Sequence, residues 1–140
     1  MTTSAFRWPL RIQFVDTDAS GRIHYTATLR HFETAEAEFM RHIGCQYNHM
    51  EERETGYPRV HVECDYIRSL TYEDMVEIGV SVLRIGAKAF TLGFQVFHQG
   101  EVAARGNIVI AAMDRQTGKS KPLPEALVQC LRPHVTPTEP

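Results

Sequence analysis

The sequence contains no long apolar run and no excess of positive charge, and both absences narrow its possible functions. None of its apolar stretches approaches the roughly 20 residues that a membrane-spanning helix needs. The segment Met1–Pro9 has neither the basic nor the apolar region of a signal peptide, so we expect a cytoplasmic protein. The 15 lysines and arginines against 17 acidic residues give a formal net charge of −2, which argues against a nucleic-acid partner.

Cysteine is also scarce, and no metal-binding motif is present. The three cysteines, Cys45, Cys64 and Cys130, form no C-x-x-C pair, so we expect inert thiols. His61–Glu63 has the H-x-E pattern of zinc deaminases, but the P-C-x-x-C half is missing and the segment alternates like a strand. The sequence also lacks H-E-x-x-H and the phosphate loop G-x-x-x-x-G-K-[ST]. We therefore predict neither a metal site nor a nucleotide-binding loop.

Hydrophobic periodicity predicts one α+β domain over residues 1–132, followed by a loose tail over 133–140. Apolar residues recur at helical spacing over 27–43, and Gly44 ends that pattern. The remaining predicted elements are strands over 6–15, 59–67, 74–83, 90–98 and 102–113, with a hairpin turn at 98–101, a weak helical turn over 46–54 and a short helix over 124–131. One long helix followed by hairpin-spaced strands indicates an antiparallel sheet covered on one side by that helix.

The segment from Phe14 to Tyr25 is the strongest functional signal. Its sequence, FVDTDASGRIHY, places Asp16 and Asp18 just before the long helix. A helix start offers free backbone N–H groups and partial positive charge, which attract an anion or a polarised oxygen. The same aspartates could instead cap and order the loop, since aspartate favours turns. We expect Gly21 to adopt a positive φ or to permit close approach of a substrate.

This segment and its surroundings resemble the hotdog-fold acyl-CoA thioesterases of the 4-hydroxybenzoyl-CoA thioesterase family. The resemblance is carried by the D-T-D-A-x-G core, by the helix sequence LRHFETAEAEFMR behind it and by FRWP at Phe6–Pro9, and it covers about residues 5–132. It is closest to the bacterial branch associated with the Tol-Pal system. The resemblance implies a hotdog fold, in which a five-stranded antiparallel sheet wraps around one long central helix. It also implies homodimers that assemble into homotetramers and hydrolyse acyl-CoA thioesters.

The resemblance further assigns roles to individual residues. Asp18 corresponds to the family's reacting acid, and Tyr25 would hold the thioester carbonyl oxygen through its backbone N–H. In the Tol-Pal-associated branch the helix starts with tyrosine then histidine, whereas this chain has His24 before Tyr25. Adjacent residues point in different directions, so His24 is predicted either to line the site or to be structural. Thr26 is predicted to cap the helix or line the same site, and Asp16 to be a structural loop residue.

Three further side chains are weaker candidates. Arg84 and Lys88 flank the turn where related enzymes contact the phosphates of CoA, although solvated turn charges are common. Glu33 could act as the helix glutamate that some hotdog thioesterases use. We expect it to belong, with Glu36 and Glu38, to a solvated helix face or a subunit contact.

The predicted function is hydrolysis of an acyl-CoA with no cofactor beyond the CoA of the substrate. An aspartate of ordinary pKa, about 3.9, is ionised at neutral pH and can attack a carbonyl or accept a proton from water. The alternatives are a hotdog dehydratase acting on 3-hydroxyacyl thioesters and a non-catalytic subunit that binds an acyl thioester or an acyl carrier. The sequence leaves the acyl group open among aromatic, short branched and medium-chain groups.

Overall fold

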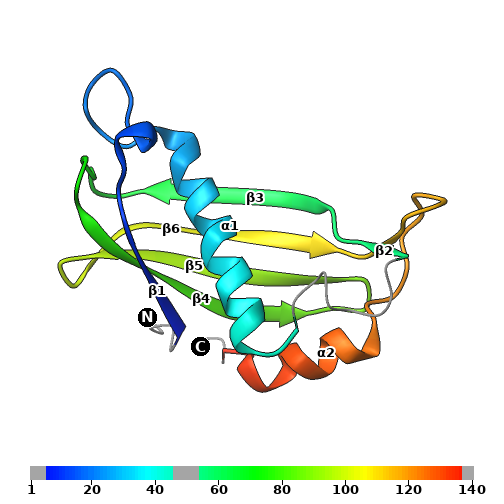
Figure 1. Ribbon diagram of the computed structural model, residues 1–140. Helices are drawn as coiled ribbons and strands as arrows, with labels where there is room; N and C mark the ends of the chain where they lie inside the picture. Colours follow the sequence, from blue (N-terminus) through cyan, green and yellow to red (C-terminus); the bar gives the residue numbers. More distant parts are fainter. Residues whose placement is uncertain (1–5, 46–53, 137–140) are drawn as a thin grey trace.

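The computed structural model describes residues 6–45 and 54–136, and Figure 1 shows their arrangement. The helical turn expected over 46–54 therefore lies, except for its last residue, outside the described residues. Within these two ranges, no helix is both long and apolar enough to cross a bilayer.

A five-stranded antiparallel sheet forms the body of the molecule, as predicted. Its spatial order is β1-β4-β5-β6-β3, so β1 and β3 are the two edge strands. The bounds are β1 Phe6–Arg11, β3 Arg59–Tyr66, β4 Met75–Ile85, β5 Ala89–His98 and β6 Glu101–Ala111. Two short strands, β2 Thr55–Gly56 and β7 Met113–Asp114, pair separately.

The long helix α1, Tyr25–His42, runs across one face of the sheet (Figure 1). Its buried stripe includes Phe32, whose ring stacks on Phe94 of β5 with centroids 4.6 Å apart. A side chain at Gly106 of β6 would meet both the Glu63 carbonyl oxygen at 2.2 Å and the Phe32 ring at 3.1 Å. The missing side chain at Gly106 is therefore what lets the helix and two strands pack closely.

The C-terminal part closes the core at one end of the sheet. The short helix α2, Glu125–Leu131, is present as predicted and buries Leu127 and Leu131 completely. A 3-10 helix, η3 Arg132–His134, follows it. Residues 133–140 were expected to be a loose tail, but the described part of that segment is attached to β4, because the Thr136 N–H donates to the Val82 carbonyl at 2.8 Å.

The first strand is shorter than the alternation of apolar residues predicted. β1 ends at Arg11 instead of Val15, and the chain then forms a 3-10 turn, η1 Phe14–Asp16. Phe14 and Val15 are each 75% exposed, so their apolar side chains do not face the core. The Asp16 carboxylate accepts a hydrogen bond from the Gln13 N–H at 2.8 Å, which favours this turn over a continued strand.

Candidate active site

The loop 17–23 that carries Asp18 is closed at its base by backbone hydrogen bonds. The Asp18 N–H donates to the Arg22 carbonyl at 2.8 Å, and the His24 N–H donates to the Asp16 carbonyl at 2.7 Å. These bonds connect the two arms of the loop directly before α1 begins. Asp18 is therefore presented on a short, closed loop whose far arm leads into the helix.

Gly21 supplies the turn of this loop, as the sequence predicted. Its φ is +82°, a conformation that residues with a side chain rarely adopt. Its N–H donates to the Asp18 carbonyl at 3.0 Å, which closes the turn. No atom lies within 4 Å of where a Cβ would be, so backbone conformation and not lack of space calls for glycine here.

The Asp18 carboxylate is exposed to solvent and is held in place by one neighbour. Its Oδ1 accepts hydrogen bonds from the Ser20 N–H at 2.8 Å and from the Ser20 hydroxyl at 2.6 Å. These bonds, the side-chain one first, hold the pKa of Asp18 below its ordinary value of 3.8. The carboxylate is therefore ionised throughout the neutral range, and both hydrogen bonds from Ser20 go to its Oδ1 and not to its Oδ2.

Helix α1 begins two residues earlier than a Thr26 cap would require, because His24 is the N-cap. The His24 Nδ1 accepts the Thr26 N–H at 3.1 Å and lies 2.8 Å from the Thr26 hydroxyl. The prediction that Thr26 caps the helix is therefore wrong, although Thr26 takes part in the cap as a donor. An accepting Nδ1 places the proton of the neutral imidazole on Nε2. The His24 ring also stacks on the Tyr25 ring, with centroids 4.6 Å apart.

The Tyr25 N–H lies at the first position of the helix and has no acceptor among the described residues. The first N–H groups of any helix lack intrahelical partners, and the helix dipole adds partial positive charge there. The Tyr66 hydroxyl of β3 donates to the Tyr25 carbonyl at 2.6 Å, which ties the helix start to the sheet. Burial raises the pKa of Tyr66 to about 12, so the hydroxyl keeps its proton. Nothing in the sequence pattern marked Tyr66, because its partner is 41 residues away.

Asp16, which the sequence indicated as structural, lies buried beneath the loop. Its side chain is 9% exposed, and its carboxylate is 3.2 Å from the His31 Nε2 and 3.4 Å from the Arg30 guanidinium. Sequence reasoning did not single out His31 as the partner of this carboxylate. A buried histidine needs a polar partner, and the signal for one was its spacing of four residues from the buried Ala27 and Ala35.

The structure separates the predicted phosphate contacts from Asp18. Arg84 and Lys88 flank the β4–β5 turn, at the end of the sheet opposite loop 17–23 (Figure 1). Both residues are exposed. Within one chain they do not reach the Asp18 carboxylate.

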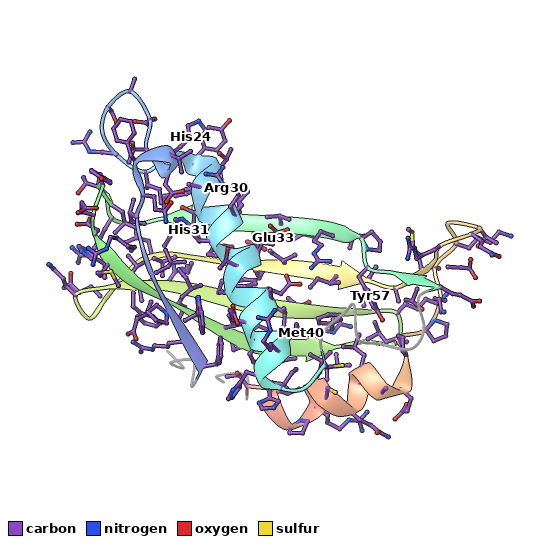
Figure 2. All side chains as sticks on the ribbon, viewed as in Figure 1. His24, Arg30, His31, Glu33, Met40 and Tyr57 are labelled. Atoms are coloured by element: carbon purple, nitrogen blue, oxygen red, sulfur yellow. The ribbon has the colours of Figure 1, made fainter. Side chains whose placement is uncertain are left out.

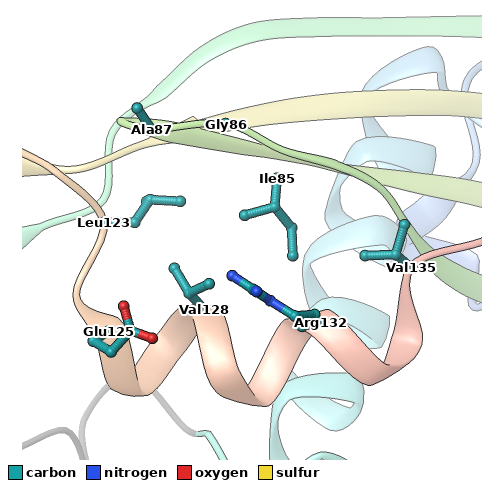
Figure 3. Close-up of a pocket in the computed structure, with 8 residues that line it drawn as sticks. All are labelled: Ile85, Gly86, Ala87, Leu123, Glu125, Val128, Arg132 and Val135. Atoms are coloured by element: carbon teal, nitrogen blue, oxygen red, sulfur yellow. The ribbon is translucent and has the colours of Figure 1, made fainter.

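A cavity of about 480 Å³ lies beside the same β4–β5 turn (Figure 3). Ile85 and Ala87 of the turn region, Val128 of α2, and Arg132 line it. The cavity is thus at the end of the molecule away from loop 17–23, and none of its lining residues belongs to that loop.

The remaining acidic residues of α1 differ in their exposure to solvent. Glu33 is exposed on α1, whereas Glu36 is buried and forms an ion pair with Arg59, so the prediction of a solvated face is wrong for Glu36. Burial raises the pKa of the Cys45 thiol to about 12, in line with an inert thiol. Among the described residues, no group of three metal-ligating side chains occurs.

Comparison with known proteins identifies the family. The model of the thioesterase-like superfamily matches residues 12–131. A 1,4-dihydroxy-2-naphthoyl-CoA hydrolase of Rippkaea orientalis is 28% identical over 128 residues, which cover 86% of this chain and 91% of that protein. The acyl-CoA thioester hydrolase YbgC of Escherichia coli O6:H1 is 21% identical over 129 residues, which cover 91% of this chain and 96% of that protein.

A solved structure supports the same fold. Slr0204 of Synechocystis, a 1,4-dihydroxy-2-naphthoyl-CoA thioesterase, matches with a TM-score of 0.84 at 16% identity, covering 91% of this chain and 95% of that chain. The predicted hotdog fold is therefore confirmed. With the match over residues 12–131, the chain belongs to the thioesterase-like superfamily.

Proposed function

We propose that this protein hydrolyses an acyl-CoA thioester to the free acid and CoA. The observation that carries the proposal is one compact unit in which the exposed, ionised Asp18 carboxylate precedes a helix whose first N–H, that of Tyr25, has no acceptor among the described residues. The named activities of the relatives, which are acyl-CoA hydrolases, support the same reaction.

In the proposed reaction, Asp18 is either the nucleophile or the base that activates the attacking water. Its Oδ2 either attacks the thioester carbonyl to form an anhydride or removes a proton from an attacking water; both routes use the same side chain. The carbonyl oxygen becomes an oxyanion that the Tyr25 N–H and the helix dipole stabilise. One such donor is worth about 3 to 4 kcal/mol of barrier. The C–S bond then breaks, and the CoA thiolate leaves without needing an acid. In the anhydride route a water then hydrolyses the anhydride, which releases the free acid and regenerates the Asp18 carboxylate. In the water route the acid is released directly, and Asp18 passes the proton it has taken to solvent.

The other predicted site residues receive supporting roles in this proposal. Gly21 and Thr26 lie on either side of the helix start, and the Nε2 of His24 is the ring nitrogen that its cap leaves available to a substrate. We assign no cofactor beyond the CoA of the substrate. The three free cysteines suit the reducing cytoplasm, where we place the enzyme.

We also propose a homodimer that assembles further into a homotetramer. The edge strand β3 has two exposed apolar residues, Val60 with 61% and Val62 with 44% of its surface exposed. An exposed apolar edge strand can pair with a strand of another chain. Such an assembly would let Arg84 and Lys88 serve the Asp18 of another subunit, which they do not reach within one chain. A light-scattering mass of the purified protein tests this: a monomeric mass would contradict it.

A panel of acyl-CoAs followed with a thiol reagent tests the activity. We expect release of free CoA thiol from at least one aromatic, short branched or medium-chain acyl-CoA. A hotdog dehydratase would instead convert a 3-hydroxyacyl-CoA to an enoyl product with no free thiol. A binding subunit would retain the acyl-CoA intact, as mass spectrometry of the recovered ligand would reveal.

A further inference from the structure

Asp16 connects the loop that carries Asp18 to the helix that starts at Tyr25. Its backbone carbonyl accepts the His24 N–H at 2.7 Å, at the junction of loop and helix. Its carboxylate accepts the Gln13 N–H at 2.8 Å on the incoming chain. One buried residue thus fixes the chain on both sides of the loop.

His31 extends this connection into the body of the helix. Figure 2 shows His24 at the start of α1 and His31 farther along the same helix, beside Arg30. The His31 Nε2 is 3.2 Å from the Asp16 Oδ2, and both side chains are about nine-tenths buried, with 10% and 9% exposed. Because burial lowers the pKa of His31, the ring is neutral at neutral pH and donates its Nε2 proton to the carboxylate.

Arg30 contacts the same carboxylate from a more exposed position. Its guanidinium lies 3.4 Å from the Asp16 Oδ1, but its side chain is 55% exposed. An exposed ion pair of this kind contributes little, because water screens it and the long side chain loses entropy. The buried hydrogen bond from His31 is therefore the one that holds Asp16 against the helix.

The consequence concerns geometry at the site. Asp18 lies on the loop and the Tyr25 N–H on the helix, so their relative position depends on how the loop is fixed to the helix. A thioester must meet the carboxylate and the N–H at once, and a displacement of about 1 Å can cost on the order of 100-fold in rate. The Asp16–His31 contact lies at the base of that arrangement, and both of its side chains are buried.

We propose that Asp16 and His31 form a positioning pair that sets the distance and angle between the Asp18 carboxylate and the Tyr25 N–H. This proposal rests on the proposed thioester hydrolysis. The pair touches neither the substrate nor the reacting atoms. It acts through the loop base and the helix start.

Three variants of the full-length protein test the pair: His31→Ala, His31→Gln and Arg30→Gln. His31→Ala removes the donor, and we expect kcat to fall about tenfold while KM changes less than about twofold. His31→Gln retains an amide donor on a longer side chain, and we expect it to recover kcat to within about threefold of the native enzyme. Arg30→Gln is the matched control on the same carboxylate and should change kcat less than about twofold.

A second readout keeps the test independent of activity. The hydrogen-exchange rates of the His24 and Asp18 amides, which donate the two hydrogen bonds at the base of the loop, should rise in His31→Ala and return toward native values in His31→Gln when measured by NMR. The native protein could release no thiol from any acyl-CoA while these exchange rates respond as expected. The proposed function would then be wrong, but the Asp16–His31 contact would still be shown to fix the loop to the start of the helix.

Two results would overturn the positioning pair. One is a folded His31→Ala protein with native kcat and native exchange rates. The other is a His31→Gln protein as impaired as His31→Ala, which would mean that the ring fills space and donates nothing. Should His31→Ala fail to fold, His31→Asn takes its place, since its shorter amide cannot span the 3.2 Å contact from the same backbone position.

Discussion

Two aspartates only two residues apart have opposite surroundings. The difference indicates which one can react with a substrate and which one holds the structure together. Asp18 is exposed on its loop, where both hydrogen bonds from Ser20 go to one of its two carboxylate oxygens. Asp16 is buried at the base of the same loop, where both of its carboxylate oxygens have protein partners. A carboxylate that must react needs an accessible oxygen, whereas the Asp16 carboxylate holds two other chain segments, the incoming chain at Gln13 and helix α1 at Arg30 and His31, with both of its oxygens. The predictions below test this division.

The largest expected effect comes from removing the charge of Asp18. The variant Asp18→Asn keeps the shape and can still accept hydrogen bonds from Ser20, but an amide neither attacks a thioester nor takes a proton from water. We expect kcat to fall by at least about 100-fold with an unchanged melting temperature. Thiol release and thermal unfolding measure the two quantities. Full activity in a folded Asn variant would refute the role of Asp18.

The second effect concerns stability and comes from Asp16. Asp16→Ala leaves the Gln13 N–H and the buried His31 ring without their acceptor. Because an unsatisfied buried donor is costly, we expect a loss of about 2 to 3 kcal/mol in the free energy of unfolding. Urea denaturation measures it. The matched control is Asp65→Ala, which removes an exposed aspartate and should cost less than about 0.5 kcal/mol.

A smaller effect should follow from the Ser20 hydroxyl. Its hydrogen bond to Asp18 at 2.6 Å is the leading cause of that residue's lowered pKa. In Ser20→Ala we expect the pKa of Asp18 to rise toward 3.8 and the neutral-pH kcat to change less than about threefold. Carboxyl carbon NMR through the acid range reports the titration. An unchanged pKa would mean that the Ser20 backbone N–H alone sets it.

The smallest expected effect is a pH dependence of stability. The pKa of His31 is lowered by burial, so the unfolded chain takes up the proton first as the pH falls through about 6.5. The stability that the neutral ring contributes is therefore complete above that pH and is lost as the pH falls toward the folded-state pKa. We expect a loss of about 1 kcal/mol or less between pH 7 and pH 5.5. If His31→Gln loses the same stability over this pH range, the loss is due to other titratable groups.

Much of the fold could be predicted because the periodicity is strong. The alternation over β4, β5 and β6 and the helical spacing of α1 both reflect a one-sided core, so each element appears close to its predicted bounds. The glycine turn of the site could also be predicted, because glycine is the residue type that most readily adopts the positive φ found at Gly21. Local chemistry sufficed in these cases.

What could not be predicted depends on contacts between distant parts of the chain. The apolar Phe14 and Val15 continued the pattern of β1, but the Asp16 hydrogen bond turns the chain away. The histidine cap at His24 competes with a threonine that also caps well, and only the folded geometry decides between them. Tyr66 reaches the helix start from β3, and no local pattern encodes such a pairing.

The most direct test of the division between the two aspartates is a crossed measurement on Asp18→Asn and Asp16→Asn. Both variants make the same chemical change, and kcat for thiol release and the melting temperature are measured on each. We predict that Asp18→Asn loses activity and keeps its melting temperature, while Asp16→Asn melts at a lower temperature and retains more activity than Asp18→Asn. An Asp18→Asn enzyme with native kcat would contradict the account.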